Sequence, residues 1–128
     1  MASDIHLEAR GFKQDQLGVV AKPSDLDPSK LNVGSGYDLI FVLSLFSHLP
    51  DKSFGPWLKA LYSSLAPGGH LMFTTHGEGA IEAHPGHFGA FKFEKPGYAY
   101  RGDSDQPDIG SSEYGTTPAR QDPLVFVD

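Results

Sequence analysis

The sequence predicts an α/β fold built on an open, mostly parallel sheet, with a β-hairpin excursion toward the C-terminus. An unbroken apolar run lies within "YDLIFVLSLF" (37–46), and such a run is typical of a strand buried on both faces of a parallel sheet. An amphipathic helix is predicted over 53–65, where apolar residues recur on one face. A second apolar strand, "HLMFTT" (70–75), follows a Pro-Gly-Gly turn. Together these segments predict a βαβ unit whose strands, 38–43 and 70–75, run parallel with a right-handed crossover.

Composition narrows the class of protein. The chain has 128 residues, which suits one domain with its own core. Its formal net charge is −6, and an acidic chain without a basic run is poorly suited to binding nucleic acid. The chain contains no cysteine, which excludes disulfides and thiolate metal ligands. With no apolar run long enough for a membrane helix and no secretory signal pattern, we expect no membrane contact and a cytoplasmic location.

The start of the chain predicts a shorter set of elements. Residues 1–5 read as the end of a strand or as a helix cap, since Asp4 is a favourable N-cap residue. A helix should follow, with Glu8 in its first turn and Gly18 at its C-terminus. The segment "VVAK" (19–22) predicts another short strand.

The last third of the chain differs in character. Gly, Pro and polar residues dominate after His76, and "FGAFKFE" and "GYAYRG" alternate on either side of "KPG". That pattern predicts an antiparallel hairpin with its turn at 95–97. We therefore expect one domain with an α/β part over 1–77 and a loop and hairpin extension over 78–128.

Two strand ends are candidates for a binding site. In open parallel α/β sheets, ligands lie beyond the carboxyl ends of the strands. Polar residues follow both strands of the βαβ unit, at 44–48 and 74–77. Each residue alone could simply cap or turn the chain, but two such ends side by side favour a site.

The same region resembles a known family. The stretch "YDLIFVLSLFSHLPDKSFGPWLKALYSSLAPGGHLMFTTHGEG" (37–79) is similar to the part of class I S-adenosylmethionine-dependent methyltransferases that follows their central strands. The matching pieces are "YDLI", "SHLP", the helix that ends in "LAPGG", and "LMFTTHG". "EYGTTPA" (113–119) also resembles a downstream segment of these enzymes. The likeness spans roughly 2–120 and is strongest over 37–77, and it implies a Rossmann-like methyltransferase fold.

The resemblance implies a set of cofactor contacts. Asp4, in "ASDI", stands at the acidic position that binds the two ribose hydroxyls, and a carboxylate can accept from both. Asp25, in "KPSDLD", would approach the adenine amino group. Ser44, Leu45 and Phe46 would face the methionine part of S-adenosylmethionine or the methyl acceptor. S-adenosylhomocysteine would be the product.

In this family a glycine-rich loop follows the first strand, and no such loop occurs before Asp4 in this sequence. We therefore expect the chain to correspond to an internal part of a methyltransferase domain. A second function stays open: a non-catalytic remnant or interaction module. Strand edges left without a partner invite pairing with another chain, so we expect a homo-oligomer.

The histidines and nearby residues offer further, weaker candidates. His76 is the better general-base candidate because it follows a strand end, whereas His48 is more typical of an orienting or capping residue. A metal site can be imagined near the acidic loop, but the spacing matches no ligand motif, and we expect none. The residues considered for it are His76, His84, His87, Glu78 and Glu82.

A dinucleotide site is a further alternative at Gly77 and Gly79, but Glu78 and Glu82 would repel a pyrophosphate. The aromatic residues over 88–100 could line an acceptor pocket or a partner surface, but packing of the hairpin onto the sheet is the favoured explanation. The sequence does not distinguish a small metabolite, a lipid, a protein or a nucleobase as methyl acceptor.

Overall fold

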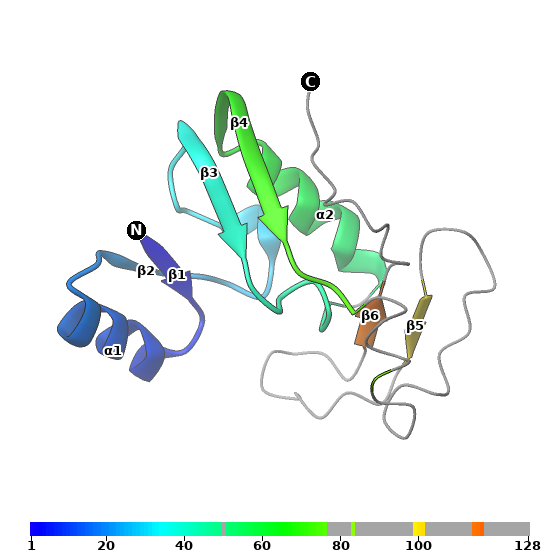
Figure 1. The fold of residues 1–128 in the computed structure, drawn as a ribbon, viewed down its shortest axis with the longest axis horizontal. Helices are drawn as coiled ribbons and strands as arrows, with labels where there is room; N and C mark the ends of the chain where they lie inside the picture. Colours follow the sequence, from blue (N-terminus) through cyan, green and yellow to red (C-terminus); the bar gives the residue numbers. More distant parts are fainter. Residues whose placement is uncertain (50, 77–82, 84–98, 102–113, 117–128) are drawn as a thin grey trace.

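The computed structural model describes residues 1–49, 51–76, 83, 99–101 and 114–116 (Figure 1). Its elements follow the chain in the order β1 (Ala2–Asp4), α1 (Leu7–Leu17), β2 (Ala21–Pro23), the 3-10 helix η1 (Pro28–Lys30), β3 (Tyr37–Val42), α2 (Asp51–Tyr62), β4 (Leu65–Phe73), β5 (Ala99–Arg101) and β6 (Tyr114–Thr116). The predicted class is confirmed, because the described part is a mixed α/β fold with short parallel strands.

The predicted βαβ unit is confirmed as β3, α2 and β4. The two strands are parallel, with Ile40 opposite Leu71 and Val42 opposite Phe73. β4 begins at Leu65, earlier than predicted, because the chain resumes pairing with Tyr37 at Leu65 and then bulges before His70. The Pro-Gly-Gly segment therefore lies within β4 instead of preceding it.

One face of this unit forms the core. α2 lies along β3 and β4 (Figure 1) and buries Trp57 and Leu61, which are one helical turn apart. They pack with Phe46, Leu49 and Leu71 into a single cluster of buried apolar side chains. Hydrophobic burial in the described residues is thus concentrated where the sequence predicted the amphipathic helix.

The opposite face of β3 and β4 is exposed, so the prediction of burial on both faces is wrong. Side chains alternate along a strand, and the pairing places Leu39 and Phe41 on the side away from Ile40 and Val42. Leu39 is 58%, Phe41 57%, Leu43 68% and Met72 52% exposed. We call these four side chains the apolar sheet face. The apolar run itself could not reveal that no described element covers its second side.

The N-terminal unit has the same order of elements but packs less tightly. β1 pairs with β2 in parallel, with Ala2 opposite Ala21 and Asp4 opposite Pro23. α1 has no buried residue. Its N-cap is His6 and not Asp4, whereas Gly18 adopts the predicted left-handed C-cap conformation with φ 62°.

The described strands form three separate two-stranded sheets, β1–β2, β3–β4 and β5–β6. The starts of β1 and β3 lie close together, since the Tyr37 hydroxyl oxygen, which donates to the Val33 carbonyl, lies 3.3 Å from the Met1 sulfur. Because the β3–β4 sheet has two strands, β3 is paired on one side only within the described segments.

The hairpin prediction is only partly tested. β5 pairs with β6 in antiparallel fashion, with Ala99 opposite Thr116 and Arg101 opposite Tyr114 (Figure 1). The predicted partner segment before residue 95 and the turn at 95–97 lie outside the described residues, as does most of the extension over 78–128. In the described part, no helix combines the length and apolar character needed to cross a membrane.

Candidate functional site

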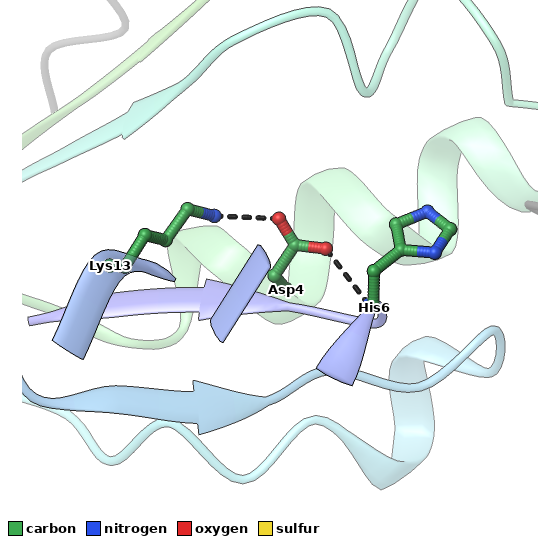
Figure 2. A network of polar contacts seen from close by, with 3 residues as sticks. All are labelled: Asp4, His6 and Lys13. Atoms are coloured by element: carbon green, nitrogen blue, oxygen red, sulfur yellow. Dashed lines mark hydrogen bonds and ion pairs between the residues drawn. The ribbon is translucent and has the colours of Figure 1, made fainter. Parts of the chain in front are cut away.

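The carboxyl end of β1 presents Asp4 between two donors (Figure 2). The Lys13 ammonium, from the second turn of α1, donates to Asp4 Oδ2 at 2.6 Å. The backbone N–H of His6 donates to Asp4 Oδ1 at 3.0 Å. Lys13 is thus folded back over the strand end, and each oxygen of the Asp4 carboxylate has one protein donor.

The surroundings favour the ionised form of Asp4. Burial raises its pKa, but the Lys13 hydrogen bond, the His6 backbone hydrogen bond and the nearby positive charges outweigh it, so the pKa lies below its usual value. The ion pair is mostly but not fully withdrawn from solvent, with 28% of the Lys13 and 23% of the Asp4 side chain exposed. Asp4 is therefore an anion at neutral pH.

The Asp4 carboxylate retains capacity for a ligand. An ionised carboxylate offers about four acceptor positions, two on each oxygen. Lys13 and His6 occupy one position on each oxygen. One acceptor position per oxygen remains, and two adjacent acceptors match the two donors of a vicinal diol. The strand end therefore fits the chemistry that the resemblance implies for Asp4.

Asp25 lies in the loop after β2 and takes part in a local turn. Its Oδ1 accepts from the Asp27 N–H at 2.9 Å and lies 3.9 Å from the Lys30 ammonium. Asp27 in turn caps η1 by accepting from the Ser29 N–H at 2.9 Å. The Asp25 side chain is 41% exposed, so it stays accessible while it stabilises the loop.

The structure brings the ends of β3 and β4 together. Ser44 donates its backbone N–H to the Thr74 side-chain oxygen at 2.8 Å. The Ser47 hydroxyl donates to the Ser44 carbonyl at 2.8 Å. Ser44 has φ 60°, which is uncommon for a residue other than glycine and marks a constrained position. The two predicted strand ends thus form one hydrogen-bonded edge.

The residues after Ser44 diverge in their exposure. Leu45 is half-buried and packs against the core. Phe46 is completely buried, with its ring 4.9 Å from Phe54 and 4.5 Å from Phe73 between centroids. Phe46 therefore supports the strand end from inside the core and presents no surface to a ligand in this structure.

The histidine candidates are placed only in part. His76 is half-buried and lies three residues beyond the end of β4. His48 is half-buried too, and its backbone N–H donates to the Leu45 carbonyl at 3.0 Å. Residues 77–82, 84 and 87 lie outside the described residues, so the dinucleotide and acidic-loop alternatives stay untested. Among the residues that the structure describes, no cluster of three or more His, Asp or Glu side chains is arranged to hold a metal ion.

Sequence reasoning missed the role of Lys13. The residue lies nine positions after Asp4, across a turn from strand to helix, and no local spacing rule joins them. The sequence does contain the two parts of this contact, an acidic residue at the end of a strand and a lysine on the helix that follows, but neither part alone predicts it. The orientation of that helix against the strand decides whether the two meet.

Comparisons with known proteins give little further guidance. No protein-family model matches the sequence. No curated protein matches it either. A solved structure described as the "DhpI-SAM-HEP complex" is similar, with 20% sequence identity and a TM-score of 0.48. The similarity covers 91% of this chain and 50% of that chain, so this chain spans about half the length of the matched structure. At that TM-score the likeness is too weak to assign a ligand or an activity.

Proposed function

We propose that this chain is part of an S-adenosylmethionine-dependent methyltransferase and binds the cofactor beyond the carboxyl ends of its parallel strands. The observation that carries the proposal is the Asp4 carboxylate at the end of β1, ionised and with an acceptor position left on each oxygen. The sequence motifs over 37–77 support it, because they resemble those of this enzyme class.

The proposed contacts follow from the placement of each residue. Asp4 accepts from the ribose hydroxyls, and the exposed carboxylate of Asp25 accepts from the adenine amino group. Ser44 and Leu45, at the joined ends of β3 and β4, border the methionine part or the methyl acceptor. Phe46 acts indirectly, since its burial fixes the turn that carries Ser44 and Leu45.

The proposed chemistry depends mainly on alignment. When bound, S-adenosylmethionine would supply an activated methyl group, and the chain would hold the acceptor in line with it. His76 is proposed as a general base for acceptors that must lose a proton. The acceptor itself is left open, and the cytoplasmic location stays a prediction from the sequence.

Calorimetric titration with S-adenosylhomocysteine tests the proposal on the full chain. We expect saturable binding that Asp4→Asn weakens by about 10- to 100-fold, because hydrogen bonds to a charged acceptor contribute that much. Asp15→Asn is the matched control, since Asp15 is exposed on α1 and the charge change is the same. Absence of saturable binding to the unmodified chain contradicts the proposed function.

A second candidate function, self-association, is favoured by the apolar sheet face. Monomeric proteins seldom leave a contiguous group of large apolar side chains exposed. Here Leu39, Phe41 and Met72 lie on two paired strands, and Leu43 directly follows the end of β3. β3 also has no partner on its second side among the described strands. A second copy of the chain that packs this face against its own would bury both sets of side chains.

Light scattering distinguishes this candidate. We expect a dimer or larger homo-oligomer that Phe41→Lys dissociates. Phe12→Lys is the matched control, because Phe12 is 62% exposed on α1, outside the apolar sheet face. A monodisperse monomer for the unmodified chain, or equal effects of the two substitutions, contradicts self-association through this face.

A further inference from the structure

We propose that Lys13 is a positioning residue for a ligand that carries a vicinal diol: it fixes the Asp4 carboxylate so that its two remaining acceptor positions face both hydroxyls. The proposal rests on the proposed function, because the diol would belong to the ribose of the cofactor. It assigns a specificity role to a residue of α1 that no motif singles out.

The geometry supports fixation rather than loose attraction. The Lys13–Asp4 distance of 2.6 Å is short for a charge-assisted hydrogen bond, and the contact is largely withdrawn from solvent. The His6 N–H holds the other oxygen from the backbone (Figure 2). A carboxylate held at both oxygens cannot rotate freely, so its free lone pairs keep a fixed direction. Such preorganisation lowers the entropy lost on binding.

Two groups of the described part of the chain bring positive charge near the Asp4 carboxylate. Lys13 on α1 and His6 in the β1–α1 connection both favour the carboxylate. β2 contributes a backbone contact, in which the Ser24 N–H donates to the Asp4 carbonyl at 2.9 Å. The charged residue of β2, Lys22, instead donates to the Val33 carbonyl at 3.3 Å. Among the residues that the structure describes, Lys13 is thus the cation whose side chain bonds directly to the Asp4 carboxylate.

Loss of Lys13 has two consequences that a purely structural role would not produce. First, discrimination between a ligand with the diol and one without it should fall, because the carboxylate is no longer fixed. Second, the pH below which binding of the diol ligand weakens should rise. Burial raises the Asp4 pKa, and without Lys13 the opposing hydrogen bond and charge are removed.

The experiment compares adenosine with 2′,3′-dideoxyadenosine on the full chain, by NMR titration from pH 4 to pH 8. For the unmodified chain we expect adenosine to bind about tenfold or more tightly, as two hydrogen bonds to a charged acceptor suggest. Lys13→Met should reduce the ratio of the affinity for adenosine to that for 2′,3′-dideoxyadenosine to about 1 to 3. It should also raise the pH below which adenosine binding weakens. Lys13→Arg should restore most of the ratio, and Lys13→Gln should restore less because it donates without a charge.

Control measurements separate the possible failures. Lys52→Met, an exposed lysine on α2, should leave the ratio unchanged, and circular dichroism should show that each variant is folded. If Lys13→Met fails to fold, the affinity ratio of Lys13→Gln is compared with that of Lys13→Arg instead. The inference is overturned if the unmodified chain prefers adenosine and both Lys13→Met and Lys13→Gln keep the same preference. That result leaves the proposed function intact. An unmodified chain that binds neither nucleoside, or both equally, overturns the diol role of Asp4 and the inference with it.

Discussion

The β1–α1–β2 unit and the β3–α2–β4 unit share an order of elements and a parallel pairing but differ in how they are held. α2 buries Trp57 and Leu61 against the sheet, whereas α1 buries no residue and leaves Leu7, Phe12 and Leu17 exposed. The strands of the first unit have three residues each, against six and nine in the second. Stability in the described residues is therefore concentrated in one unit, while the most distinctive polar site lies in the other.

The largest test of this comparison is a pair of phenylalanine truncations. Phe46→Ala should lower the free energy of unfolding by about 3 to 5 kcal/mol, since it empties a fully buried site. Phe12→Ala on α1 should change it by less than about 0.5 kcal/mol, because the side chain is exposed. Urea denaturation measures both. Similar losses for the two substitutions would contradict the contrast between the units.

A pair of glycine substitutions should act with opposite signs. A Cβ at Gly69 would lie 2.6 Å from the Tyr37 carbonyl oxygen, so Gly69→Ala should destabilise by about 1 to 3 kcal/mol. A Cβ at Gly11 would meet nothing within 4 Å, so Gly11→Ala should stabilise by about 0.5 to 1 kcal/mol through helix propensity. Thermal unfolding of the two variants reports the signs. A destabilised Gly11→Ala would show that α1 is more closely packed than described.

The joined strand ends supply a smaller test. Thr74→Val removes the acceptor for the Ser44 N–H and should destabilise by about 0.5 to 1.5 kcal/mol. Thr74→Ser keeps the hydroxyl and should remain near the unmodified chain. Hydrogen exchange at the Ser44 amide locates the effect. Unchanged protection of that amide in Thr74→Val would mean that the turn is held by other contacts.

The smallest expected effect is the pH dependence of the Asp4–Lys13 pair. Because the folded-state pKa of Asp4 is lowered, its stabilising contribution is present above the ordinary aspartate pKa and is lost as pH falls through the folded-state pKa. Lys13→Met should therefore cost at most about 1 kcal/mol at pH 7. Unfolding curves at several pH values should show the gap between the two chains closing below about pH 4. A gap that is constant down to pH 2 would rule out the ion pair as its source.

The sequence predicted the β3–α2–β4 unit well because its signals are local. The apolar run and the spacing of Trp57 and Leu61 each arise within one element. The exposure of Leu39 and Phe41 could not be predicted in the same way, because it depends on which elements cover the second face. An apolar run shows that a strand can be buried on both faces, but long-range packing decides whether it is.

The candidate site was predictable in outline and not in contact detail. Asp4 and Ser44 were expected at strand ends, and the structure places them there. The burial of Phe46 was not foreseen, because it follows from the turn at Ser44, whose positive φ redirects the chain into the core. The Lys13 contact depends on the orientation of α1 against β1, which no periodicity encodes.

The unequal strand lengths also determine the order in which the two strand pairs would separate under a pulling force. If Met1 and His76 were pulled apart, each parallel pair would be loaded along its strands, so that its hydrogen bonds share the force. The three-residue pairing of β1 with β2 has fewer bonds to share it than the longer pairing of β3 with β4. Under tension, the pairing of β1 with β2 would break first and disrupt the strand end that holds the Asp4 carboxylate, while the core around α2 stayed folded.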